Sequence, residues 1–165
     1  MLRHLRVKNL ALIDDLELSF DDGLNVITGE TGAGKSLLMQ ALSLAVGGRA
    51  TADVIRHETQ EAVVEAVFDA MDVRLIQLLE EGGYTADGEL LVRRIITHNG
   101  RSRIYLNGAA VTATILRQAG ERLMHIYGQH EQHVLLEAEA ALGLLDGFAV
   151  LSTQTGEMTR HYQTL

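Results

Sequence analysis

Residues 29–36 have the types and the spacing of a phosphate-binding loop. They are, in order, Gly29, Glu30, Thr31, Gly32, Ala33, Gly34, Lys35 and Ser36, which fit the pattern G-x-x-x-x-G-K-[ST]. The glycines let backbone N–H groups point at phosphate oxygens that side chains would otherwise obstruct. Lys35 adds a positive charge for the β- and γ-phosphates, and the hydroxyl of Ser36 suits Mg²⁺, which prefers oxygen ligands. The stretch therefore predicts a site for ATP with Mg²⁺.

A strand before this loop and a helix after it would position these groups. The run LNVIT at 24–28 is apolar, contains β-branched residues and predicts a strand that stops at Gly29. From residue 36 to 46 apolar side chains recur at helical spacing, and the pattern ends at two glycines, 47 and 48. The amino end of this helix would direct its dipole at the phosphates. Its apolar stripe predicts core packing by Leu38, Leu42 and Ala45.

The rest of the chain predicts an α/β layer architecture. We expect strands at 2–8, 16–20, 62–70 and 123–128, and helices at 73–83, 112–122 and 130–146. The clearest hairpin lies at 89–108, where two β-rich runs meet around Asn99 and Gly100. This order predicts a P-loop fold that carries a β-rich antiparallel insert.

Composition limits the classes of protein to which the chain can belong. Its 165 residues suit one domain with a hydrophobic core, and the absence of cysteine excludes disulfides and thiolate metal sites. No apolar run approaches the roughly 20 residues of a membrane helix, so we expect a cytoplasmic protein with no membrane partner. The formal net charge of −8 repels nucleic acid unless a local basic patch overrides it.

Two separated stretches resemble one protein family. The first 50 residues, from MLRHLRVKNL to ALSLAVGGRA, are similar to the amino-terminal segment of the RecN family, bacterial DNA repair relatives of the SMC ATPases. The stretch IYGQHEQH at 126–133 resembles the Q-loop region of that family. Its Gln129 follows an expected buried strand, as a Q-loop glutamine should. The resemblance runs from Met1 to about Phe148.

The resemblance implies an ABC/SMC-type ATPase head that a long coiled coil divides into two lobes. Residues 1–148 would be the amino-terminal lobe, and 149–165 the start of the coiled coil or a truncated tail. Gln129 would reach the Mg²⁺ or the attacking water and would be catalytic together with Lys35. ATP would lie between two heads of a homodimer, which acts on DNA at the nucleoid in recombinational repair of double-strand breaks.

Two motifs of a complete head are missing from the sequence. No L-S-G-G-[QE] signature occurs, and ALGLLDG at 141–147, which contains Asp146, imitates a Walker B strand but has the composition of a helix. The resemblance places both motifs in a carboxy-terminal lobe of the same protein. We therefore expect this chain alone to bind nucleotide weakly and to hydrolyse it little.

Two other functions remain open at this point. One is a nucleotide-gated interaction module that dimerises heads without turnover. The other is the ATPase lobe of an ABC transporter or another ABC-type protein. The long stretch between Ser36 and Gln129 argues against a transporter lobe, as does the lack of a stacking aromatic residue just upstream.

Several polar side chains have both a functional and an ordinary interpretation. Arg49 and Arg56 follow the P-loop helix and would contact phosphates or the opposite head, or else lie in a solvated loop. A basic cluster on the hairpin would contact DNA phosphates, or else be solvated. Its members are Arg93, Arg94, His98, Arg101 and Arg103. His130 and His133 have a spacing that a metal ion uses, without a convincing third ligand.

Overall fold

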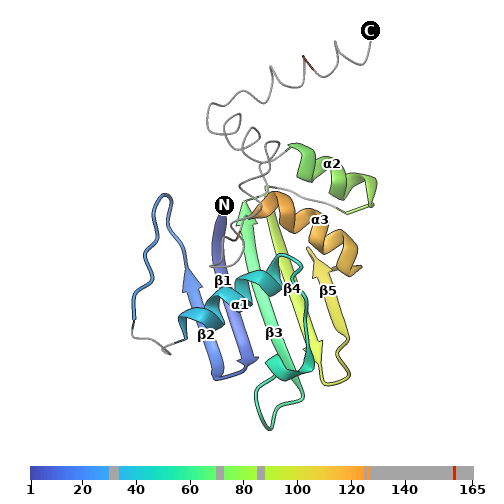
Figure 1. Cartoon of the computed structure of the whole chain (residues 1–165). Coiled ribbons are helices and arrows are strands. Elements are labelled where there is room, and N and C mark those ends of the chain that lie inside the picture. The colour runs from blue at the N-terminus through green and yellow to red at the C-terminus, as the bar shows by residue number, and fades with distance from the viewer. Residues whose placement is uncertain (30–33, 70–72, 85–87, 125, 127–157, 159–165) are drawn as a thin grey trace. The chain divides into compact units, whose positions relative to one another are not determined.

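The computed structural model describes residues 1–29, 34–69, 73–84, 88–124, 126 and 158 (Figure 1). The chain divides into two compact units, Met1–His125 and Ile126–Leu165, and nearly all described residues belong to the first. The predicted domain boundary at residue 148 lies outside the described residues.

A six-stranded antiparallel sheet forms the centre of the first unit. The strands lie in the order β2-β1-β3-β4-β5-β6, so β2 and β6 are its edges. Their bounds are β1 Leu2–Leu10, β2 Ile13–Ser19, β3 Glu61–Asp69, β4 Glu89–Thr97, β5 Ser102–Leu106 and β6 Ala109–Val111. The predicted hairpin is confirmed as β4 and β5, and both strands belong to this one sheet rather than to a separate insert.

Alternating side chains give the sheet one apolar face and one charged face. In β3 every second residue is buried. The register aligns Val64 of β3 with Val7 of β1, so buried positions of neighbouring strands share a face. On the opposite face Arg6, Glu65 and Arg93 are aligned in the same way. The sheet can therefore be covered by helices on one side only.

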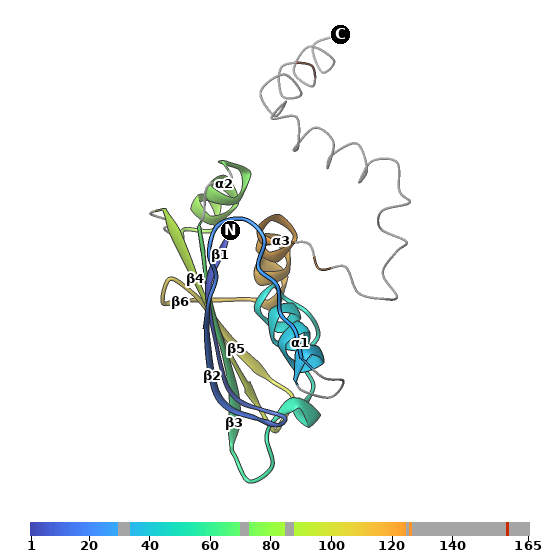
Figure 2. The same cartoon turned by 90° about the vertical axis from the view of Figure 1, so that its left-hand side faces the viewer.

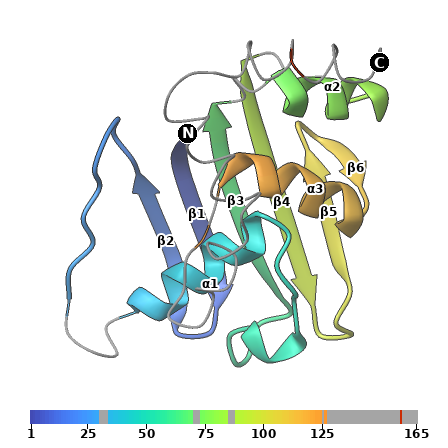
Figure 3. The ribbon, with the colours of Figure 1, turned by 45° about the horizontal axis from the view of Figure 1, so that its top comes forward.

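Helices α1 Lys35–Ala45 and α3 Ala113–Leu123 lie on one face of the sheet, and Figure 2 shows no described helix on the other. Both helices cross over the strands (Figure 3). α1 packs across β1, β3 and β4, while α3 contacts β5 and α2 Val73–Glu81. A short 3-10 helix, η1 Ala52–Val54, follows α1. The predicted α/β architecture and its first three helices are confirmed, and no helix of the described ranges is long and apolar enough to cross a membrane.

The predicted strand at 24–28 does not form. Residues 24–28 follow the edge strand β2 in the chain and have no strand structure (Figure 1). Their apolar side chains are exposed, at 89% for Leu24, 70% for Val26 and 49% for Ile27. A strand requires a neighbour that bonds its backbone groups, and this segment has none among the described strands. Apolar and β-branched residues alone therefore predicted the wrong local structure.

The predicted strand at 123–128 is wrong at its start. α3 continues through Leu123, and Met124 is its C-cap. The helix begins where predicted, because the Thr112 side chain accepts a hydrogen bond of 3.3 Å from the Ile115 amide. Residues 125, 127 and 128 lie outside the described ranges.

Candidate nucleotide-binding site

The amino end of α1 is open to an anion. Gly34 is its N-cap, with φ +91° and ψ −3°, a left-handed conformation that favours glycine. Among the described residues no side chain caps this helix end, and the first turn of α1 contains no acidic residue. The first helical bond, from the Leu38 amide to the Gly34 carbonyl, is 2.9 Å long. The first-turn amides and the positive end of the helix dipole can therefore both face an anion.

Lys35 joins the two described ends of the predicted phosphate-binding loop. Its Nζ donates a hydrogen bond to the carbonyl oxygen of Gly29. Ser36 is exposed, so its hydroxyl is accessible at the same helix end. Four predicted loop residues lie outside the described ranges: Glu30, Thr31, Gly32 and Ala33. The described ammonium and helix amides suit the phosphates of a nucleoside triphosphate, and the described hydroxyl suits its Mg²⁺.

Apolar packing fixes α1 against the sheet. Leu38, Leu42 and Ala45 are buried as predicted, together with Ala41 and Leu44. Fully burying one leucine side chain stabilises a fold by about 1.5–3 kcal/mol. Since α1 is a rigid unit, the position of the phosphate-binding groups follows from the packing of this stripe.

Arg56 is held against the turn between β1 and β2. Its Nη1 donates to the Leu12 carbonyl at 2.9 Å, and its backbone amide donates to the Asn9 carbonyl at 2.9 Å. The Ala11 amide in turn donates to the Val54 carbonyl at 2.8 Å. The loop after α1 is thereby fixed to the β1–β2 turn, whereas Arg49 at its start is exposed. Contact of either arginine with phosphates or a second head stays a prediction.

The prediction of a basic cluster on the hairpin is wrong for Arg94, because this side chain is buried. Arg94 is only 4% exposed and lies on the apolar face of β4. Its Nη1 donates to two carbonyl oxygens at the end of α1, those of Leu44 at 2.8 Å and Gly48 at 2.7 Å. Burial lowers the pKa of the Arg94 guanidinium. Arg94 lies two residues from buried Val92 and two from buried Ile96, so the period of a strand places it on the same face as these two side chains.

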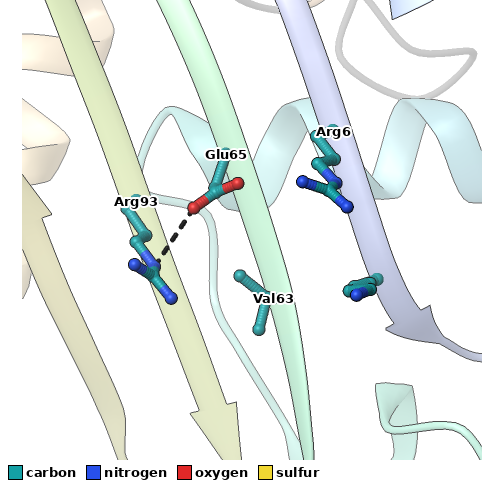
Figure 4. A pocket seen from close by; sticks show the side chains of 5 residues that line it. Arg6, Val63, Glu65 and Arg93 are labelled. Carbon is teal, nitrogen blue, oxygen red and sulfur yellow. Dashed lines mark ion pairs between the residues drawn. The ribbon is translucent and has the colours of Figure 1, made fainter. Parts of the chain in front are cut away.

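Arg93 and Arg103 lie on the charged face and are paired with acids. Arg93 Nε lies 3.1 Å from Glu65 Oε1, and Arg103 Nη2 lies 2.9 Å from Glu61 Oε2. Figure 4 shows the first pair beside a hollow of about 310 Å³ on this face, opposite α1. The residues that line the hollow are Arg6, Lys8, Val63, Glu65 and Arg93. His98 Nε2 is 2.7 Å from the Thr59 carbonyl oxygen. With Arg94, four members of the predicted cluster therefore have partners within the chain.

The other predicted site residues lie outside the described ranges. They are Gln129, His130, His133 and Asp146. Among the residues that the structure does describe, no group of three or more His, Cys, Asp or Glu side chains could hold a metal ion.

The chain is similar in sequence to known proteins over most of its length. The AAA domain family matches residues 4–133. The DNA repair protein RecN of Halalkalibacterium halodurans is 42% identical over 151 residues, which make up 90% of this chain and 27% of that protein. The chain thus spans little more than a quarter of the length of this relative.

Solved structures share the fold at low sequence identity. An SMC ATPase chain, from work on ATP-driven dimerization and DNA-stimulated activation, aligns with a TM-score of 0.64 and 19% identity over 88% of this chain and 97% of its own. The SMC head domain from Thermotoga maritima aligns with a TM-score of 0.54 and 24% identity over 71% of this chain and 41% of its own. These likenesses show that the sheet and its helices have the fold of an SMC-type head.

Proposed function

Because the chain belongs to the AAA domain family and, within it, to the RecN proteins, we propose that it is the ATP-binding lobe of an SMC-like ATPase head. The observation that carries this proposal is the amino end of α1, where Lys35 and Ser36 lie at a helix end that no described side chain caps. The left-handed N-cap Gly34 and the P-loop sequence pattern support it independently. The proposed ligand is ATP with Mg²⁺.

Each residue of the site has its own task toward ATP. The first-turn amides of α1 bind phosphate oxygens, and Lys35 neutralises charge on the β- and γ-phosphates. The hydroxyl of Ser36 is the proposed ligand for Mg²⁺, which when bound neutralises charge on the phosphates. Gln129 is the proposed orienter of the attacking water or a further Mg²⁺ ligand, and this role rests on the Q-loop resemblance.

Hydrolysis, in this proposal, requires a carboxy-terminal lobe of the same protein. The exposed Leu24, Val26 and Ile27 directly precede the loop, and a strand from a second lobe would pair with 24–28 and cover them. That lobe would also supply the Walker B acid and the signature motif. A second head of a homodimer would complete the site around the nucleotide.

We further propose that the whole protein acts in the cytoplasm, at the nucleoid, in recombinational repair of DNA double-strand breaks. The RecN relatives support this role, since they are DNA repair proteins. We do not assign DNA contacts to the hairpin, because Arg93 and Arg103 are neutralised by Glu65 and Glu61, and Arg94 is buried.

Isothermal titration calorimetry with ATP and Mg²⁺ tests the binding site. Lys35→Ala should weaken binding at least about tenfold, because it removes a charged hydrogen-bond donor. Lys8→Ala is the matched control, since Lys8 lies on the opposite face of the sheet, 3.5 Å from Asp15. Equal affinity of wild type and Lys35→Ala would refute the nucleotide site.

Turnover measurements test the need for a second lobe. The 165-residue chain should hydrolyse ATP slowly, and adding the carboxy-terminal lobe should raise the rate in a manner that Lys35→Ala abolishes. Rapid turnover by the chain alone, lost in Lys35→Ala, would contradict the proposal. ATP-dependent dimerisation of the reassembled head without any turnover would instead favour a nucleotide-gated interaction module.

A further inference from the structure

The carboxyl end of the P-loop helix is anchored to the sheet by one buried guanidinium. Arg94 Nη1 donates to the carbonyl oxygens of Leu44 and Gly48, at 2.8 and 2.7 Å. Its Nε donates to Ser102 Oγ at 3.3 Å, which holds the guanidinium against β5. A single side chain of β4 therefore connects the last turn of α1, Gly48 shortly after the end of that helix, and the neighbouring strand β5.

This guanidinium has no acidic partner among the residues that the structure describes. Within the described ranges no carboxylate forms an ion pair with Arg94, whereas its neighbour Arg93 pairs with Glu65. Its hydrogen bonds go to backbone carbonyls at the negative end of the α1 dipole and to the Ser102 hydroxyl, and these dipoles compensate the charge in place of a counter-ion. Burying an ionised group without a counter-ion is costly, so an apolar side chain of similar size would serve packing alone at least as well. We therefore attribute to the charged guanidinium a role in fixing the position of the carboxyl end of α1.

Close backbone packing holds the same helix end from the side of α3. Gly47 has φ +100°, and a Cβ there would lie 2.7 Å from the Arg117 Cα. A Cβ on Gly120 of α3 would collide with the carbonyl oxygen of Val46. The end of α1 thus has no room to shift toward α3, while Arg94 holds it to the sheet.

We infer that Arg94 is a positioning residue for the nucleotide site: by fixing the carboxyl end of α1 it sets the place of Lys35 and Ser36 at the amino end. This inference rests on the proposed nucleotide-binding function. An 11-residue α-helix is about 16 Å long and moves as a unit, so a shift at Leu44 reaches the phosphate-binding groups. The bond to Gly48 also fixes the start of loop 49–56, which carries Arg49 and Arg56.

The experiment compares Arg94→Met with Arg93→Met, which removes the adjacent charge from the opposite face of the same strand. Amide hydrogen exchange of the nucleotide-free 165-residue chain is measured first. Arg94→Met should speed exchange in the last turn of α1 and in loop 49–56, and Arg93→Met should leave both unchanged. Calorimetry with ATP and Mg²⁺ should then show binding weakened about tenfold or more by Arg94→Met only.

Arg94→Lys separates positioning from folding. Lysine keeps the charge and can reach one of the two carbonyls, so this variant should recover part of the ATP affinity and part of the exchange protection. Two results would overturn the inference. One is ATP affinity in folded Arg94→Met equal to that of the wild type. The other is exchange that rises evenly over the whole chain, with no recovery in Arg94→Lys.

The same experiments distinguish failure of this inference from failure of the proposed nucleotide-binding function. If wild type and Lys35→Ala bind ATP equally, the nucleotide site is refuted. The exchange data on the nucleotide-free chain then decide the anchoring of α1 by themselves. Local acceleration in Arg94→Met alone supports the anchor, and its absence overturns it.

Discussion

At the scale of single residues, Asp15 makes the stability of the sheet depend on pH. Arg6 donates two hydrogen bonds to its carboxylate, at 3.3 and 3.1 Å, and Lys8 lies 3.5 Å away. The hydrogen bond from Arg6 is the main cause of a lowered pKa for Asp15 in the folded chain. The unfolded chain therefore takes up the proton first, near the ordinary pKa of 3.8. The stabilisation is present above that pH and is lost as pH falls through the folded-state pKa.

Asp15→Asn should accordingly make the free energy of unfolding depend less on pH under acidic conditions. We expect the variant to lose less stability than the wild type between about pH 5 and pH 3, in urea unfolding followed by circular dichroism. Because both side chains are exposed, the difference should be small. Arg6→Met should produce the same weaker pH dependence, and the double variant should add nothing to it. Additive effects would show that the two groups act independently.

Gly34 has a backbone role that can be separated from its role in ATP binding. Gly34 and Gly23 both have a positive φ, +91° and +87°, and an added Cβ at either position would meet no atom of the described residues within 4 Å. Gly34→Ala and Gly23→Ala should therefore each lose about 1 kcal/mol of stability in urea unfolding. Only Gly34→Ala should weaken ATP binding in calorimetry. Equal ATP affinity in the two variants would show that the N-cap conformation of α1 is not part of the site.

The candidate site was predictable where its chemistry is local in sequence. Gly34, Lys35 and Ser36 act through a loop and a helix end, and both are specified by consecutive residues. Arg94 was not predicted, because an arginine in a basic run favours solvent. Its true orientation depends on the face of β4 that the sheet buries, and that follows from pairing with distant strands.

At the scale of elements, the stability of α3 depends on its N-cap residue, Thr112. The Thr112 side chain accepts a hydrogen bond from the Ile115 amide, and this satisfies one backbone donor of the first turn. Thr112→Ala should lower the free energy of unfolding by about 1 kcal/mol. Thr114→Ala, at an exposed position inside the same helix, should be neutral or slightly stabilising because alanine favours helices. Urea unfolding of both variants measures the difference, and equal losses would contradict the capping role.

Elements whose ends are marked by local signals were predicted well, among them the hairpin of β4 and β5, whereas the run 24–28 and the end of α3 were not. Helices α1 and α3 have an apolar stripe and clear ends, so local signals specify them. The run 24–28 has strand composition, but no described strand pairs with it. The run from 123 onward was assigned to a strand although α3 still includes Leu123, because boundary signals are weaker than the periodicity of a helix.

At the scale of the whole molecule, charge pairing makes the charged face of the sheet an unfavourable surface for DNA. The net charge is −8, and the cations Arg6, Arg93 and Arg103 on this face each pair with an acid. Exposed pairs of this kind contribute little stability, but they cancel the local positive potential. The exposed apolar run 24–28 is therefore a stronger candidate for an intermolecular contact than the charged face.

Val26 tests whether that run is the contact with the proposed carboxy-terminal lobe. Val26→Ser should change the stability of the 165-residue chain by less than about 0.5 kcal/mol, because the side chain is already 70% exposed. Association with the separately produced lobe should weaken about tenfold, since burial of a valine contributes roughly 1.5 kcal/mol or more. Val73→Ser is the matched control, because Val73 is 66% exposed but begins α2, away from the run. Titration calorimetry of wild type and both variants measures the effect, and equal weakening by both would place the contact elsewhere.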